Sequence, residues 1–218
     1  METSSIKNTR NKWQGCCHLG KFKNLKAGMT YVELIIVLSI FSVMTSVVLF
    51  DYRGFQGRVD VKVLANDIAL QIVEAQRSSM SGKLNLAAGT TWKPSYGLRF
   101  NLDNNNNKRF VYFVDLDNNG SYTGPTIGNS TCNQECLDKI DITKGNFISS
   151  LRISGTGCPA TTNNITITFK RPSSLANIKA TPSLGPSCKI EYVAIDVVSP
   201  NALGSTIKVY SSGRIDID

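Results

Sequence analysis

The chain has almost no histidine. Its single one, His18, lies among the first 28 of 218 residues. The remainder can therefore build neither a Ser-His or Cys-His nucleophilic pair nor a histidine metal site. A glycine-rich phosphate cradle is also missing, because no helical pattern follows the glycines of ISGTGCP. Asp115 and Asp117 could form a carboxylate pair, but alternate positions at a strand end are more typical of a turn or a cation loop. We expect a protein that is not an enzyme.

Acidic residues are scarce at the N-terminus. Residues 1–28 hold six basic residues and one acidic residue, a net charge of +5 out of +8 for the whole chain. The other 190 residues contribute only +3. Most of the basic charge therefore precedes the apolar segment described below, where the positive-inside rule would place it on the cytoplasmic side. As an indication of nucleic-acid binding, the bulk charge is weak.

Zinc-type cysteine spacing is absent as well. Of the six cysteines, the polar C-terminal part holds Cys132, Cys136, Cys158 and Cys188. A C-x3-C spacing without a paired C-x2-C or a nearby histidine makes a poor zinc site. Four cysteines in an exported domain indicate two disulfides, with three possible pairings. Sequence proximity favours Cys132–Cys136 and Cys158–Cys188.

Charge is almost absent from residues 29–50, where Glu33 is the only charged residue. As a helix these 22 residues span about 33 Å, enough to cross a bilayer. A secretory signal peptide usually has a shorter apolar core followed by an A-x-A-like cleavage site, and no such site follows here. We expect a transmembrane or filament-core helix.

The helical pattern continues through residues 51–88 with a different character. Apolar residues recur every three or four positions with polar residues on the other faces; they are Val61, Leu64, Ala65, Ile68, Ile72 and Ala75. Gly54 and Gly57 mark a weak point between the two halves, and the helix should end near Gly82. The prediction is one long helix, apolar on all sides first and amphipathic afterwards.

From about residue 89 the apolar period changes to two. The alternation predicts an exported, β-rich globular domain over residues 89–218, with strands at 96–102, 109–115, 147–154, 165–170, 189–199, 206–210 and 214–217. In the fourth strand, Ile165, Ile167 and Phe169 alternate with polar residues, a half-buried pattern. A helix followed by strands is an α+β order, with the amphipathic half of the helix packed on an antiparallel sheet.

Glu33 is costly in an apolar span, because a carboxylate at a bilayer centre costs about 2.5–3.5 kcal/mol on insertion scales. If the chain is cut after Gly28, Met29 becomes the N-terminus and Glu33 the fifth residue, one helical turn away. A buried charge is tolerable when an opposite charge pairs with it. In a stack of such helices, Glu33 of one subunit could pair with the Met29 amine of its neighbour and fix the axial register.

The stretch GMTYVELIIVLSIFSVMTSVVLF, with the basic segment before it, resembles the class III signal of the type IV pilin and pseudopilin family. The resemblance implies that a prepilin peptidase removes residues 1–28 between Gly28 and Met29, usually with methylation of the new N-terminus. Met29 replaces the commoner Phe, and Glu33 matches the family's fifth position. The implied partners are other pilins or pseudopilins in a filament and an inner-membrane assembly platform. The implied location is the inner membrane, single-pass, with a cytoplasmic N-terminus and the globular domain outside, followed by the filament.

Downstream stretches narrow this resemblance. SYGLRF, VYFVDLDNNGSY, NITITFKRPS and IKVYSSGRIDI occur in the order and spacing of GspH/FimT-like minor pseudopilins and minor pilins, although Ser173 and Ser174 stand where a glycine is common. The resemblance implies a pilin-like fold and a subunit of a type II secretion, type IV pilus or DNA-uptake filament.

A DNA-binding minor pilin is the alternative function. Some FimT relatives bind DNA through a Gly-Arg-x-Arg tail, but here Arg214 is followed by Ile215 and Asp216, and the chain ends in Asp218. Acidic residues at that place would repel phosphate. We therefore expect no nucleic-acid partner and assign no DNA-binding residue.

The stretch DLDNNGSYTGPT begins like a calcium loop, with Asp115, Asp117 and Asn119 at positions 1, 3 and 5 and Gly120 at position 6. Position 12, where an EF-hand places a bidentate glutamate, is Thr126. A hairpin turn built from Asn, Asp and Gly is the favoured interpretation. Weak binding of Ca²⁺ is the alternative, and we otherwise expect no cofactor.

Overall fold

The computed structural model describes residues 28–85, 94–124, 132, 135–181, 184–185, 187–201 and 203–218, without the side chains of residues 51, 53, 104 and 105. Thr126 and all of the expected leader except Gly28 lie outside these residues. The chain divides into two compact units, Met1–Thr45 and Ser46–Asp218. The described part of the first unit is the beginning of one helix, and the second unit contains the rest of that helix and all the described strands.

The helix, α1 (Tyr31–Ser81), has 51 residues and is continuous through Gly54 and Gly57. The glycines therefore do not divide it, although glycine is a weak helix former. In its second half the residues predicted to face the sheets are buried or half-buried, with Val61, Ala65, Ile68 and Ile72 no more than 1% exposed. The packing of this face begins at Val61, directly after the glycine pair, and stabilises the second half of the helix.

The helix ends where the sequence predicts. Gly82 has a φ of 65°, and its N–H donates to the Ser79 carbonyl at 3.1 Å, while the Lys83 N–H donates to the Ser78 carbonyl at 3.0 Å. These two bonds form a Schellman cap, whose left-handed residue is usually glycine.

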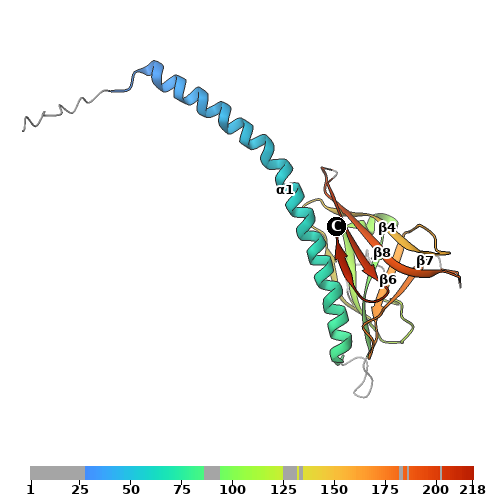
Figure 1. The fold of residues 1–218 in the computed structure, drawn as a ribbon. Helices are drawn as coiled ribbons and strands as arrows, with labels where there is room; N and C mark the ends of the chain where they lie inside the picture. The colour runs from blue at the N-terminus through green and yellow to red at the C-terminus, as the bar shows by residue number, and fades with distance from the viewer. Residues whose placement is uncertain are drawn as a thin grey trace, which may run out of the picture. The chain divides into compact units, whose positions relative to one another are not determined.

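The strands form two five-stranded antiparallel sheets. The first has the order β3 (Cys136–Asp141), β2 (Arg109–Asp115), β1 (Ser95–Asn101), β6 (Asn164–Phe169), β7 (Ala176–Thr181). The second has the order β10 (Ile215–Ile217), β9 (Gly204–Tyr210), β8 (Lys189–Val198), β4 (Phe147–Thr156), β5 (Thr161–Thr162). A 3₁₀ helix, η2 (Asp103–Lys108), connects β1 and β2. Together with α1, the sheets confirm the predicted α+β class (Figure 1).

All seven predicted strands are present, and their ends move by no more than two residues. The three strands that alternation did not predict are β3, β5 and β7, and each lies at the edge of its sheet. In β3 the charges of CLDKID hide any alternation, and β5 has only two residues. The sequence of β7, ANIKAT, does alternate, so this strand was missed although its pattern is present.

The main core combines side chains from α1 and from both sheets. It includes Tyr96, Leu98 and Phe100 from β1 together with Ile195 from β8. A second cluster on the other face of the first sheet consists of Val111, Phe113, Tyr122 and Cys136.

The half-buried pattern predicted for β6 is wrong, because all six residues of this strand are buried. Thr166 and Thr168, which were expected to face solvent, are 5% and 1% exposed. The turn after β2 lies over this face, where Asn119 and Gly120 line the same small hollow as Thr168. The first sheet is therefore covered on both faces at this point.

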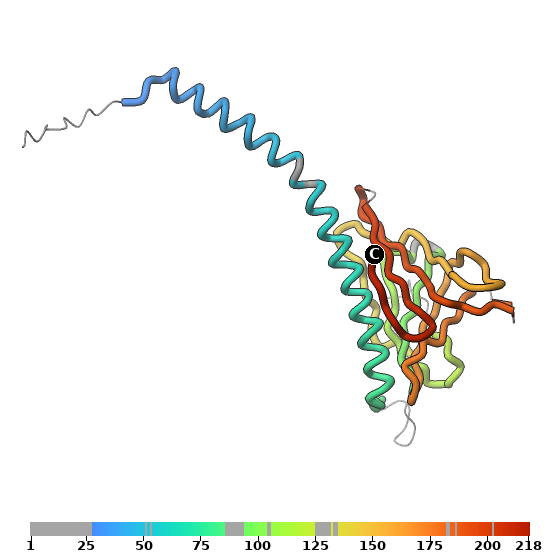
Figure 2. Tube along the Cα trace, in the orientation of Figure 1, coloured from blue at the N-terminus to red at the C-terminus, as the bar shows by residue number. Residues whose placement is uncertain are grey.

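Hydrogen bonds fasten the C-terminal end of α1 to both sheets. Ser79 Oγ donates to the Phe169 carbonyl of β6 at 2.6 Å. Gln76 Nε2 donates to the carbonyls of Ser174 (3.0 Å) and Gly213 (3.3 Å), so the dark red β9–β10 hairpin runs beside the helix (Figure 2). Gly213 is needed there, because an added Cβ would lie 2.1 Å from the Ser174 carbonyl oxygen and φ is +86°.

Candidate functional site

The expected processing site immediately precedes α1. Gly28, Met29 and Thr30 are all exposed and lie outside the helix. Among the described residues, apart from its neighbour in the chain, no atom lies within 4 Å of the position that a Cβ on Gly28 would take. The peptide bond between Gly28 and Met29 is thus in non-helical, exposed backbone, a form that a peptidase can bind without unwinding a helix.

Glu33 lies in the first turn of α1. The Glu33 N–H donates to Thr30 Oγ1 at 3.3 Å, and the Leu34 N–H donates to the Thr30 carbonyl at 3.2 Å. Thr30 therefore acts as the N-cap. Because the helix dipole is positive at this end, it favours the Glu33 carboxylate. The helix therefore begins at Tyr31, three residues after Gly28, and Met29 lies directly before the cap, four residues from Glu33.

The apolar segment, residues 29–50, exposes its large side chains. By length and composition α1 contains one stretch that could cross a membrane, close to the N-terminus, and none of that stretch is buried. Exposure of the large apolar side chains ranges from 44% at Leu34 to 81% at Phe50. An apolar surface of this extent usually marks contact with a membrane or with other proteins.

Three carboxylates meet after β2. One oxygen each from Asp115, Asp117 and Glu135 lies within 4.8 Å of the others. Asp115 and Glu135 are buried, while Asp117 is exposed. The Asn119 N–H donates to Asp115 Oδ1 and to Asp117 Oδ1, both at 3.1 Å. The structure thus brings the carboxylates of Asp115 and Asp117 together and adds Glu135. Asn119 contacts them as a donor, because its Nδ2 also donates to Asp117 Oδ2 at 2.6 Å while its Oδ1 accepts the Ser121 N–H at 2.6 Å.

Backbone N–H groups hold the two buried carboxylates. Gly120 donates to Asp115 Oδ2 at 3.0 Å, while Leu116 and Thr123 donate to the two oxygens of Glu135 at 2.9 and 2.6 Å. Burial raises the pKa of Asp115 to about 6; the Gly120 hydrogen bond lowers it in part, and the nearby carboxylates of Asp117 and Glu135 raise it further.

The donor set fits a hard cation. Carboxylate oxygens are the ligands that Ca²⁺ prefers, and an oxygen that accepts one N–H keeps a second lone pair. Glu135 supplies a third carboxylate that the EF-hand pattern could not find, since it expects one at Thr126. A bound cation would favour the ionised form of Asp115 and lower its pKa. Ca²⁺ binding by Asp115, Asp117 and Asn119 stays a prediction, and Glu135 joins that set.

Glu135 was missed because it lies outside the loop in sequence. Its carbonyl accepts the Val114 N–H at 2.9 Å, so strand pairing between β2 and the start of β3 brings it beside Asp115. The only signal in the sequence was its position next to Cys136, a residue expected to be in a disulfide.

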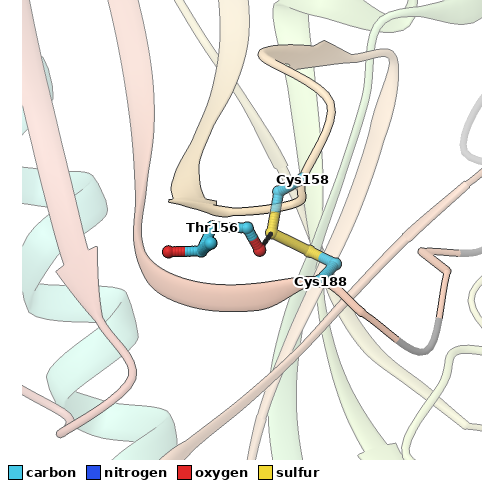
Figure 3. The surroundings of a disulfide bond; sticks show 3 residues. All are labelled: Thr156, Cys158 and Cys188. Atoms are coloured by element: carbon cyan, nitrogen blue, oxygen red, sulfur yellow. Dashed lines mark hydrogen bonds between the residues drawn. A yellow bond between two sulfur atoms is a disulfide. The ribbon is translucent and has the colours of Figure 1, made fainter.

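The structure contains two disulfides, Cys132–Cys136 and Cys158–Cys188. This is the pairing that sequence proximity favours. The second disulfide joins the segment after β4 to the segment before β8, next to the last paired residues of these strands, Thr156 and Lys189. In Figure 3, Cys158 Sγ lies beside the Thr156 carbonyl oxygen, at 3.7 Å. Disulfides of this kind are typical of domains exported from the cytoplasm.

The cations of the C-terminal tail are paired. Arg214 Nη2 lies 2.8 Å from Asp216 Oδ2, and its guanidinium carbon lies 4.0 Å from the centre of the Tyr210 ring. Lys208 forms an ion pair with Asp218. Because each cation has a carboxylate beside it, the tail offers little net positive charge to a phosphate backbone.

No protein-family model matches the chain, and no curated protein or solved structure is significantly similar to it. The architecture itself is consistent with a pilin-like fold. The chain has a long, apolar N-terminal helix whose second half packs on antiparallel sheets.

Proposed function

We propose that the chain is a non-enzymatic, membrane-anchored subunit of a pilin-like filament, which assembles through the apolar segment of α1. One observation supports this most: a single helix exposes apolar residues over its first twenty positions and buries one face under the chain's own sheets in its second half. A membrane can cover the first part before assembly, and the helices of neighbouring subunits can cover it afterwards.

Glu33 gives the assembly its register in this proposal. Once the bond after Gly28 is cut, the Met29 amine is a positive charge just before the helix, four residues from Glu33. Within an apolar filament core each of these charges needs a partner. A pairing between subunits satisfies both charges at one axial offset, which disfavours other offsets.

The finer assignment rests on the sequence resemblance. It makes the chain a GspH/FimT-like minor pilin or pseudopilin of a type II secretion or type IV pilus system, processed by a prepilin peptidase and delivered to an inner-membrane assembly platform. The exported domain, stapled by two disulfides, would then lie outside the cytoplasm. The paired tail cations argue against a DNA receptor.

Mass spectrometry of the membrane fraction tests the processing step. We expect the mature chain to begin at Met29 and to gain the mass of one methyl group. A mature chain that begins elsewhere would contradict the proposal.

Substitution of Glu33 tests the assembly step. Glu33→Gln keeps the shape and removes the charge, and we expect membrane insertion to be unchanged while incorporation into filaments falls at least about tenfold, because one charge of a buried pair loses its partner. Asp67→Ala is the matched control, since Asp67 is an exposed carboxylate on the same helix but beyond the apolar segment. Equal filament yields from the two variants would mean that Glu33 does not set the register.

A further inference from the structure

A polar hollow opens at the end of the two-sheet unit that lies nearest to Phe50 along α1. We call it the basal hollow; it has a volume of about 240 Å³, and its walls include Gly57, Asp60, Lys144, Asn146, Ser199 and Asn201. Three segments supply these residues: α1, the turn between β3 and β4, and the turn between β8 and β9.

The hollow contains unused hydrogen-bonding capacity. Ser199 is 3% exposed, and among the described residues its Oγ has no hydrogen-bond partner. Asn146, in the opposite turn, is also buried at 3% exposure. A buried hydroxyl without a partner is costly in a folded protein. It is therefore a candidate to bind a polar group from outside the chain.

A charged pair stands at the rim of the hollow. Lys144 Nζ lies 2.6 Å from Asp60 Oδ1, with 59% of the lysine side chain and 16% of the aspartate side chain exposed. An ammonium group has three N–H donors, so two remain for another acceptor. Lys144 occupies the left-handed region, with φ of 60°, and the adjacent Gly145 is in the same region. This tight turn fixes the lysine at the rim.

Gly57 lies on the α1 side of the hollow. An added Cβ would lie 3.4 Å from Leu203 Cδ1 and 3.5 Å from Asn201 Nδ2, which are ordinary van der Waals distances. The β8–β9 turn therefore packs directly against α1 at this point.

Along α1 the hollow begins just beyond the headgroup region of a membrane that covers residues 29–50. The apolar segment ends at Phe50, and Gln56 to Asp60 follow about 9–15 Å further along a helix that rises 1.5 Å per residue. The polar headgroup region adds about 5–8 Å to each side of the hydrocarbon core. Tyr52 and Phe55, between the two, are 58% and 66% exposed, and aromatic residues are typical of the membrane interface.

The charge near the hollow is favourable for phosphate. Arg58 and Lys62, in the same turns of α1 as Asp60, are exposed. Lys144 is paired with Asp60, so this pair adds no net charge, and the net positive charge beside the hollow comes from Arg58 and Lys62. Basic residues close to a membrane surface are attracted by anionic lipids.

We propose that the basal hollow binds the phosphate of a phospholipid head group while the subunit is membrane-anchored. Lys144 donates to a phosphate oxygen, and the Ser199 hydroxyl and the Asn201 amide provide further donors. Tyr52 and Phe55 insert beside the glycerol region. The contact holds the two-sheet unit against the membrane surface until the helix leaves the bilayer. This inference rests on the membrane anchoring in the proposed function.

Hydrogen exchange of the full chain tests the contact. The chain is compared in phosphatidylglycerol nanodiscs, in phosphatidylcholine nanodiscs and in dodecylmaltoside micelles, which contain no phosphate. We expect amides of residues 143–147, 198, 199 and 201 to exchange about tenfold more slowly in phosphatidylglycerol nanodiscs than in micelles, as for a site exposed to ligand at ten times its Kd. Phosphatidylcholine, which keeps the phosphate without net negative charge, should give a smaller slowing.

Variants separate binding from local folding. Lys144→Ala and Ser199→Ala should remove the difference between nanodiscs and micelles, and Lys144→Arg should keep it. Lys208→Ala is the matched control, because Lys208 is also ion-paired but lies on β9, away from the hollow, and should change nothing. Each variant is compared with itself in micelles, so a merely loosened turn raises both rates and leaves their ratio unchanged.

Two results would overturn the proposal. One is equal exchange in nanodiscs and micelles for a chain that co-floats with lipid, which leaves the membrane anchor intact and removes only the headgroup contact. The other is full protection by inorganic phosphate added to micelles, which would identify a site for a free anion. A chain that does not co-float with lipid would reject the membrane anchor itself, and with it the proposed function.

Discussion

The two parts of α1 are both rich in apolar residues, but they differ in what covers them. In the second part the apolar residues follow one face, and Ile68 and Ile72 are fully buried by the two sheets. In residues 29–50 they occupy every face and are exposed. One part belongs to a domain with its own core, whereas the other reaches a low free energy only in a membrane or against other helices. In the proposed function this difference separates folding from assembly within one helix, and the following predictions test that separation.

The largest effect is expected from Ile72→Ala. Ile72 is 0% exposed, so its truncation should lower the free energy of unfolding of the two-sheet unit by about 2–5 kcal/mol. The control is Leu70→Ala on the opposite face, where the side chain is 64% exposed, and the expected change is within about 0.5 kcal/mol. Urea unfolding of the full chain in micelles, followed by near-ultraviolet circular dichroism, measures both. Equal losses would show that the two faces are not distinct.

The two disulfides should differ in their effect on the same unit. Cys158–Cys188 closes a separation of 30 residues and Cys132–Cys136 a separation of 4. With the chain-entropy relation, their loss should cost about 3.6 and about 2 kcal/mol.

Double Cys→Ser variants in the same unfolding experiment give the comparison. Membrane insertion should be unaffected, because both disulfides lie outside α1. If loss of Cys132–Cys136 lowers the free energy of unfolding more than loss of Cys158–Cys188, the short disulfide stabilises the unit by holding the segment around Glu135 in place rather than by closing a loop.

The free energy of unfolding should depend on pH through Asp115, in the loop after β2. The pKa of Asp115 is about 6 in the folded chain, above its ordinary value of 3.8. The folded state therefore binds this proton more tightly, and the Asp115 contribution to the free energy of unfolding should fall as pH rises from about 4 to about 6. Asp115→Asn should remove that fall in a buffer with a metal chelator.

Another titrating carboxylate lies below this window. Burial raises the pKa of Asp196, but hydrogen bonds from Arg152, Ser150 and Thr206 outweigh it and bring the pKa to about 2. Its contribution is present above the ordinary value and is lost only as pH falls toward 2. If the free energy of unfolding of the Asp115→Asn variant falls with pH between 4.5 and 6.5 as steeply as that of the unsubstituted chain, Asp115 does not cause the fall.

The smallest effect on stability is expected at Glu33. Because it lies in the exposed first turn of α1, Glu33→Ala should change the unfolding free energy of the two-sheet unit by less than about 0.5 kcal/mol, while filament incorporation falls. Parallel unfolding and filament-yield measurements test this. A loss of stability equal to that of Ile72→Ala would mean that assembly and folding are not separable.

Much of the fold was readable from local patterns. The 3.6-residue period of Val61 to Ala75, the glycine at 82 and the alternation in strands such as Ile165–Phe169 are properties of neighbouring residues, and the structure bears out the elements they predict. Two edge strands offered no alternation to detect, because charges hide it in the CLDKID sequence of β3 and because β5 has only two residues. The third, β7, was missed although its sequence ANIKAT alternates. The double burial of β6 escaped because the covering turn, at residues 118–120, lies more than forty positions away.

The sequence by itself determined the helix, the apolar segment with its single carboxylate, and the order of helix and strands, since each follows from residues a few positions apart. Only the tertiary structure decided that Glu135 joins Asp115 and Asp117, that Thr166 and Thr168 are buried, and that Ser199 faces a hollow beside Gly57. These features depend on strand pairing and on the docking of turns against α1. No local pattern encodes them, because burial and proximity between distant residues arise only when the whole chain packs.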